Sequence, residues 1–215
     1  MSKKQALTEF HRGSILAAAE RLFAEKGTEK TTMDDIAREA EYSKATLYVY
    51  FQSKEEIINA ILLSGMVLLQ KKLHEAIEGR EDWFGAYDAI CGAIIRFYEE
   101  NPSTYEAAAS QLAILSPDAE PTGEAKELVR VSREINRELV SFLEQGVEQD
   151  IVHASRPMPE TILLFWASLS GMVRTAEQAE AYIKSAFGLE RSGFLKDGTR
   201  LLLNAIIGGR APEGE

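Results

Sequence analysis

Three helix-start signals stand within residues 31–56, much closer together than ordinary helices allow. They are Thr32, Ser43 and Ser53, and such hydroxyl side chains cap a helix by accepting a hydrogen bond from a backbone N–H of its first turn. Because helices of globular proteins average about 11 residues, this spacing leaves room only for two very short helices before a third begins. Two short helices joined by a tight turn predict a helix-turn-helix.

The first short helix, after Thr32, can bury only one narrow face. Asp35 stands three positions after Thr32, where its carboxylate can complete a capping box. The helical spacing predicts an apolar stripe made of Met33, Ile36, Ala37 and Ala40.

The second short helix, after Ser43, has an even thinner apolar line, formed by Leu47 and Phe51. The lysine, threonine and tyrosine side chains on its other faces suit the phosphate oxygens and base edges of DNA. We therefore interpret it as a recognition helix, with packing inside the small domain as the alternative for its tyrosines. The residues expected to contact phosphates are Thr32, Ser43, Tyr48, Tyr50 and Lys54, and those expected nearest the base edges are Lys44, Ala45, Thr46 and Val49.

The segment that contains these helices resembles a known family. The run Ser-Lys-x-Thr-Leu-Tyr-x-Tyr-Phe-x-Ser-Lys-Glu, which starts at Ser43, is highly specific, and residues from about Thr8 to Ile58 are similar to the DNA-binding domain of the TetR family of bacterial transcriptional repressors. The other matching residues are Arg12, Ile15, Leu16, Ala19, Leu22, Phe23, Gly27, Thr32, Ile36, Ala37 and Ala40.

Three residues depart from the family pattern. Glu41 occupies a turn position usually held by glycine, Tyr42 replaces a small aliphatic residue, and Val49 replaces a polar or aromatic one. A left-handed backbone at Glu41 would cost about 1 to 2 kcal/mol. These changes leave the base preference and the pitch of the recognition helix open.

The whole chain is expected to be all-α, since no alternating run is long enough for a sheet. We predict an N-terminal three-helix helix-turn-helix domain (residues 1–55), joined by a long helix to a larger helical effector-binding and dimerisation domain (residues 56–215). Residues 1–7 are expected to form a mobile basic arm, with a disordered tail as the alternative. The predicted longer helices cover residues 8–26, 54–78, 83–100, 103–115, 124–150, 159–182 and 192–208.

Charge is unevenly divided along the chain. The net charge is −10, yet residues 1–55 hold nine basic and nine acidic side chains, so the acidic excess lies entirely in the second part. Selective, salt-sensitive DNA binding with weak non-specific affinity is expected. We see neither a secretory signal nor an apolar run of about 20 residues, and therefore expect a cytoplasmic protein that makes no membrane contact.

The resemblance also implies an effector and a dimer. Regulators of this family hold a mostly apolar ligand cavity, and the aromatic residues here suit a lipophilic or aromatic molecule, although core packing better explains each of them taken alone. The residues expected in the pocket are Trp83, Tyr87, Cys91, Phe97, Tyr98, Tyr105, Gln111, Arg133 and Trp166. In this family the last two helices form a four-helix interface between two copies. An intramolecular core is the alternative for the candidate interface residues Leu163, Trp166, Ser170, Leu202 and Ile206.

Other functions find less support in the sequence. The histidines His11, His74 and His153 are isolated, and we see no nucleophile elbow or phosphate loop, so neither an enzyme, a cofactor nor a metal is expected. The single cysteine, Cys91, excludes an internal disulfide, and it is either a buried apolar residue or a redox-sensing thiol. An activator or a protein-binding adaptor that lost operator binding also stays open.

Overall fold

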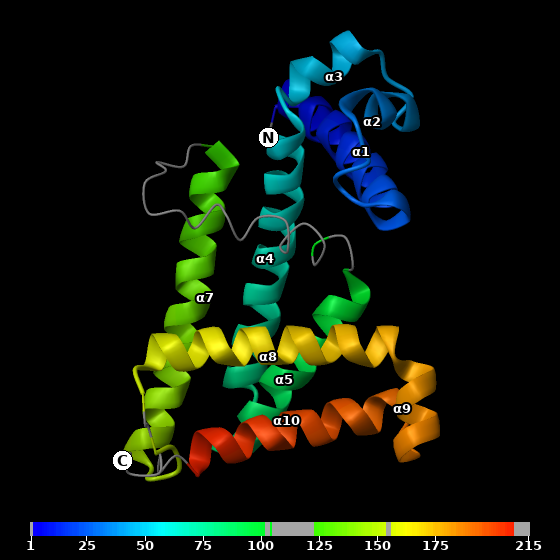
Figure 1. The fold of residues 1–215 in the computed structure, drawn as a ribbon. Coiled ribbons are helices and arrows are strands. Elements are labelled where there is room, and N and C mark those ends of the chain that lie inside the picture. Colours follow the sequence, from blue (N-terminus) through cyan, green and yellow to red (C-terminus); the bar gives the residue numbers. More distant parts are fainter. Residues whose placement is uncertain (1, 102–103, 105–122, 154–155, 209–215) are drawn as a thin grey trace. The chain divides into compact units, whose positions relative to one another are not determined.

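The computed structural model describes residues 2–101, 104, 123–153 and 156–208, and every regular element among them is a helix (Figure 1). The predicted all-α fold is confirmed, whereas the helix predicted at residues 103–115 lies, apart from Thr104, outside the described part. No helix in the described ranges combines the length and the apolar character that crossing a membrane requires. The helices are α1 (Lys3–Lys26), α2 (Met33–Glu39), α3 (Lys44–Tyr50), α4 (Lys54–Glu78), α5 (Trp83–Glu100), α7 (Gly123–Glu148), α8 (Met158–Gln178), α9 (Glu180–Phe187) and α10 (Arg191–Ile207).

The chain divides into two compact units. The first comprises the described residues of Met1–Leu68 and Glu100–Ser132, and the second those of Leu69–Glu99 and Arg133–Glu215. The helices α4 and α7 therefore contribute residues to both units. The functional boundary predicted after residue 55 stays a prediction, because DNA and effector binding define it rather than packing.

The first unit begins with a helix where a mobile arm was expected. The Ser2 hydroxyl accepts a hydrogen bond from Gln5 N, and the Gln5 side chain accepts one from Ser2 N, so a complete capping box starts α1 at Lys3. The predicted arm is thus wrong for residues 3–7. The other end of α1 agrees with the sequence prediction, since Gly27 terminates it with φ of 81°, a conformation that glycine adopts without a steric penalty.

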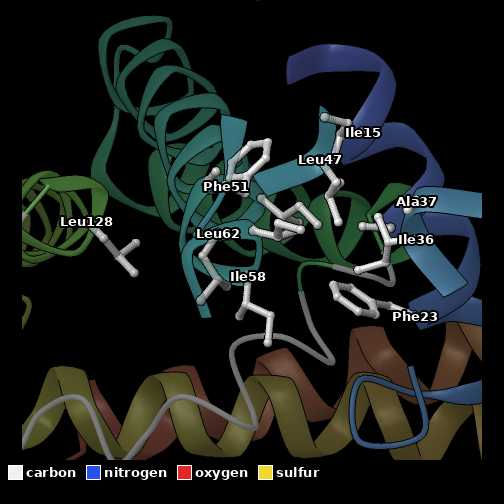
Figure 2. Close-up of a cluster of buried hydrophobic side chains, with 13 residues drawn as sticks. Ile15, Phe23, Ile36, Ala37, Leu47, Phe51, Ile58, Leu62 and Leu128 are labelled. Atoms are coloured by element: carbon white, nitrogen blue, oxygen red, sulfur yellow. The ribbon is translucent and has the colours of Figure 1, made fainter. Parts of the chain in front are cut away.

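Helices α1, α2 and α3 pack against one another around an apolar cluster (Figure 2). Because α2 and α3 have only seven residues each, one or two buried side chains must hold each helix in place. The α2 stripe contributes Ile36 and Ala37, and α3 contributes Leu47, which is completely buried. The remaining members of the cluster are Ile15, Ala19, Phe23, Phe51, Ile57, Ile58, Ala60, Ile61, Leu62 and Leu128.

In the second unit, α8, α9 and α10 pack against one another (Figure 1). The single helix predicted over residues 159–182 is interrupted, because Ala179, with φ of −114° and ψ of 20°, leaves the helical conformation between α8 and α9. Elsewhere in this unit the Trp83 and Phe142 rings stack with centroids 4.8 Å apart, and the Trp83 indole donates to Phe142 O at 3.1 Å.

Candidate functional site

The helix α2 is fixed at its start by the capping box expected from the sequence. The Thr32 hydroxyl accepts from Asp35 N at 3.1 Å, and an Asp35 oxygen accepts from Thr32 N at 3.1 Å. The Lys26 ammonium lies 2.8 Å from the same carboxylate. These bonds to Lys26 and Thr32 hold the pKa of Asp35 well below its usual value. The ionised Asp35 carboxylate therefore links the end of α1, through Lys26, to the start of α2, through Thr32.

The turn after α2 has the geometry of a Schellman motif. Glu41 has φ of 61°, its N–H donates to Arg38 O at 3.2 Å, and Tyr42 N donates to Ala37 O at 2.9 Å. This is the left-handed conformation anticipated for Glu41, and it turns the chain sharply between α2 and α3. Because Glu41 has a Cβ atom, unlike the glycine usual at this position, the left-handed conformation carries a steric cost here.

Tyr42 fastens this turn to α1 by a polar contact. The Tyr42 hydroxyl lies 2.6 Å from His11 Nδ1, and the His11 ring also lies 5.4 Å from the Tyr50 ring at the end of α3. All three side chains are half-buried. Tyr42 thus replaces the packing of a small aliphatic residue with a hydrogen bond that connects the turn to α1, where the His11 ring in turn lies beside Tyr50 of α3.

The outer face of α3 brings together four of the predicted DNA-contact residues. Lys44, Ala45, Tyr48 and Val49 are exposed, and Val49 is 74% exposed. Lys44 is not isolated, because its ammonium lies 2.7 Å from the Asp34 carboxylate, which raises the pKa of the lysine. Sequence reasoning missed Asp34 as a neighbour of the recognition helix, since no helical periodicity relates residues 34 and 44.

The hydroxyl groups at the start of α3 are engaged within the helix. Ser43 Oγ accepts from Thr46 N at 3.1 Å and lies 2.8 Å from the Thr46 hydroxyl. At the other end, the Gln52 side-chain amide donates to Tyr48 O at 2.5 Å. The polar side chains of Ser43, Thr46 and Gln52 therefore serve first to cap α3.

Two basic side chains of the first unit, Lys54 and Arg12, point into the fold. Lys54 donates to Thr28 O at 2.9 Å and to Thr31 O at 3.1 Å. Arg12 lies 4.1 Å from the centre of the Phe51 ring, donates to Tyr50 O at 2.8 Å and pairs with Glu124. Lys54 thus holds the loop between α1 and α2, and Arg12 supports the end of α3. A phosphate contact of Lys54 stays a prediction.

The candidate effector residues of the second unit are mainly core residues. Trp83, Cys91 and Phe97 are buried, Tyr98 is half-buried and Arg133 is exposed. Tyr105 and Gln111 lie outside the described residues. Burial raises the pKa of the Cys91 thiol to about 12, and such a thiol is poorly reactive because the thiolate is the nucleophile.

Tyr87 borders a small cavity of the second unit, and Cys91 borders a separate cleft of about 620 Å³. A cavity of about 20 Å³ is lined by Tyr87, Ile90, Leu139, Phe142, Leu143, Thr161, Ile162, Phe165 and Ile206. A neighbouring cleft of about 310 Å³ shares Thr161, Phe165 and Ile206 with it and adds the polar side chains of His153, Arg156 and Ser168. The cavity has room for no ligand, whereas the cleft is at the lower end of the range for ligand pockets, about 300 to 1,000 Å³.

The candidate dimer residues on α8 and α10 differ in exposure. Leu163 is 64% exposed, and the leucines Leu164 on α8 and Leu201 on α10 are 47% and 70% exposed. Leu202 and Ile206 are half-buried in the cleft, and Ser170 is half-buried as well. Trp166, which was predicted for both pocket and interface, is half-buried, and its indole lies 3.3 Å from the Asn136 amide oxygen. Leu163 is therefore the most accessible of the five.

The segment that contains the helix-turn-helix is similar to known proteins. Residues 15–61 match the family model described as bacterial regulatory proteins, tetR family. Over 69 residues, which are 32% of this chain and 34% of the relative, the chain is 38% identical to YfiR of Bacillus subtilis strain 168, an uncharacterized HTH-type transcriptional regulator. The aligned segment thus spans about a third of that relative.

Solved structures extend the similarity to most of the chain. The TetR family transcriptional regulator PfmR from Thermus thermophilus is 25% identical, with 92% of this chain and 99% of PfmR covered and a TM-score of 0.65. The ketosteroid transcriptional regulator KstR2 of Mycobacterium tuberculosis has the same fold at 18% identity, with 91% and 94% covered and a TM-score of 0.68. With the helix-turn-helix of α2 and α3, these similarities identify the chain as a member of the tetR family of bacterial regulatory proteins.

Proposed function

We propose that this chain is a homodimeric transcriptional repressor that binds a palindromic operator and is released from it by a small lipophilic effector. The observation that carries the proposal is the outer face of α3, which follows a Schellman turn and presents Lys44, Ala45, Tyr48 and Val49 to solvent. A helix presented in this way fits the major groove of DNA.

Dimerisation is supported by the exposed leucines of α8 and α10. Leu163, Leu164 and Leu201 are 47% to 70% exposed, which costs free energy in water and favours association with a second apolar surface. A symmetric dimer would present two recognition helices to successive major grooves, about 34 to 36 Å apart. An effector that favours a dimer with another spacing would release the operator.

The effector is proposed to enter the cleft beside Phe165 and Ile206 in the second unit. Its lining is largely apolar, with His153 and Arg156 as polar groups, so a lipophilic molecule with one polar or anionic group fits best. The name of KstR2, a ketosteroid regulator of the same fold, makes a ketosteroid a reasonable first probe. A long-chain carboxylate is the second.

The direct test is a gel-shift titration of the full chain against the DNA that flanks its own gene, at about 50 mM and about 200 mM salt. We expect a saturable shift that weakens with salt and that only specific DNA competes, because phosphate contacts release counterions. Adding a ketosteroid or a long-chain carboxylate should then weaken the shift. A folded dimer that gives no shift at either salt concentration would contradict the repressor function.

Two substitutions distinguish predicted base contacts from predicted phosphate contacts. Thr46→Ala should change the preference among operator sequences, because Thr46 is predicted to lie near the base edges. Lys54→Met should weaken binding to all sequences alike, because Lys54 holds the loop between α1 and α2 through Thr28 O and Thr31 O and is predicted to lie near phosphate.

A further inference from the structure

The recognition helix lacks most of the side chains that usually read DNA bases by hydrogen bonds. Guanine is read by arginine or lysine, adenine by asparagine or glutamine, and cytosine by aspartate or glutamate. The sequence of α3 is Lys-Ala-Thr-Leu-Tyr-Val-Tyr, from Lys44 to Tyr50. Among these seven residues only Lys44 belongs to the set of bidentate readers.

Several polar side chains near this face already have partners within the protein. The Lys44 ammonium lies 2.7 Å from Asp34 Oδ1, Thr46 and Ser43 are bonded to each other, and the Gln52 amide donates to Tyr48 O. Using any of these groups for base readout would first break an existing interaction. Hydrogen bonding therefore contributes little discrimination from this part of α3.

What α3 does offer is an apolar strip. Ala45 and Val49 are both exposed, Val49 to 74%, and they stand four residues apart, one above the other on the same face. In the major groove each base pair presents a different pattern of hydrogen-bond donors and acceptors. The apolar group exposed there is the C5-methyl group of thymine. An exposed aliphatic side chain on a recognition helix is chemically matched to that group.

We propose that Val49 reads a thymine through its C5-methyl group, with Ala45 extending the same strip toward a second thymine. This inference rests on the proposed function, since it requires α3 to enter the major groove. The Cβ atoms of residues four apart on a helix are about 5 to 6 Å apart, and neighbouring base pairs are separated by about 3.4 Å. The two thymines therefore stand one or two base steps apart in each half-site.

The test removes single methyl groups from DNA. Full-length protein selects its operator from a random pool, and each thymine of the operator is then replaced by deoxyuridine, which keeps base pairing and lacks only the C5-methyl. We expect one position per half-site, at the Val49 thymine, where the affinity of the wild type falls about fourfold, the factor that corresponds to one methylene-sized group. The thymine beside Ala45 should show a smaller loss, because alanine offers less apolar surface. Val49→Ala should bind the thymine and deoxyuridine operators equally at that position.

Tyr48→Phe is the matched control, because Tyr48 is an exposed neighbour on the same helix. Replacing the thymine by deoxyuridine should lower the affinity of Tyr48→Phe by the same factor as that of the wild type, whatever the overall affinity of the variant. The high exposure of Val49 means that its truncation leaves the fold intact, which circular dichroism verifies. Indifference of the wild type to every deoxyuridine, or an undiminished methyl effect in Val49→Ala, would overturn the inference while leaving the repressor function standing. Failure to select any DNA would overturn both.

Discussion

At the scale of single residues, Glu41 is the position where the fold carries an avoidable cost. Its φ of 61° lies in the left-handed region, which costs a residue with a side chain about 1 to 2 kcal/mol. Glycine removes that cost but loses about 0.5 to 1 kcal/mol more chain entropy on folding. We therefore predict that Glu41→Gly raises the free energy of unfolding by up to about 1 kcal/mol, measured by urea denaturation.

Glu41→Ala is the control for this prediction. Alanine keeps the left-handed strain while removing the carboxylate, so its free energy of unfolding should stay within about 0.5 kcal/mol of the wild type. If the glycine variant were less stable than the alanine variant, strain at the turn would not be the reason for the difference.

At the scale of helices, a polar ladder joins α4 to α7 within the second unit. Gln70 donates to Glu134 at 3.1 Å, and His74 Nδ1 lies 2.9 Å from Glu138 while its Nε2 lies 3.3 Å from Glu78. Each ring nitrogen thus faces a carboxylate, which only the doubly protonated ring can satisfy. The hydrogen bond to Glu138 and the charges of Glu78, Glu138 and Glu75 raise the pKa of His74 above its ordinary value of 6.5.

The ladder predicts that the second unit loses stability as the pH rises above the ordinary histidine pKa of 6.5 and through the raised pKa of His74. Because the folded-state pKa of His74 is raised, its contribution is fully present below the unfolded pKa and is lost as pH passes through the folded pKa. His74→Gln should flatten this part of the profile of denaturation midpoint against pH. His153→Gln is the control, since His153 is similarly exposed and lies 4.0 Å from a single carboxylate, Asp150. Equal profiles for the wild type and His74→Gln would rule out the ladder as the source.

Some helix boundaries could be predicted from the sequence, whereas others could not. The caps at Thr32 and Ser43 were predictable because they join residues only three apart, as were both ends of α4. The break at Ala179 was not, since no proline or glycine marks it. The pairs Lys44–Asp34 and Arg12–Glu124 depend on tertiary packing, so the sequence did not predict either pair, and Lys44 was assigned to DNA alone.

At the scale of the whole molecule, residues 56–215 carry the whole acidic excess, and like charges on two copies repel each other. If the protein is a dimer, these residues must therefore associate through their apolar surface. We predict that Leu163→Glu raises the dimer dissociation constant at least about 100-fold, because an unpaired carboxylate would be buried in the interface. Sedimentation should then show monomers, and operator affinity should fall with it. Tyr182→Glu on α9 is the control, because Tyr182 is also 64% exposed. A dimeric Leu163→Glu protein would place the interface on another surface.

The burial of Cys91 makes the protein a convenient subject for chemical labelling. It is the only cysteine of the chain, it is 3% exposed, and its thiol stays protonated near neutral pH because its pKa is about 12. A maleimide fluorophore should therefore leave the native wild type unmodified. A cysteine introduced at an exposed position such as Tyr182 would then carry the dye alone, and could report on assembly by energy transfer without removal of the natural thiol.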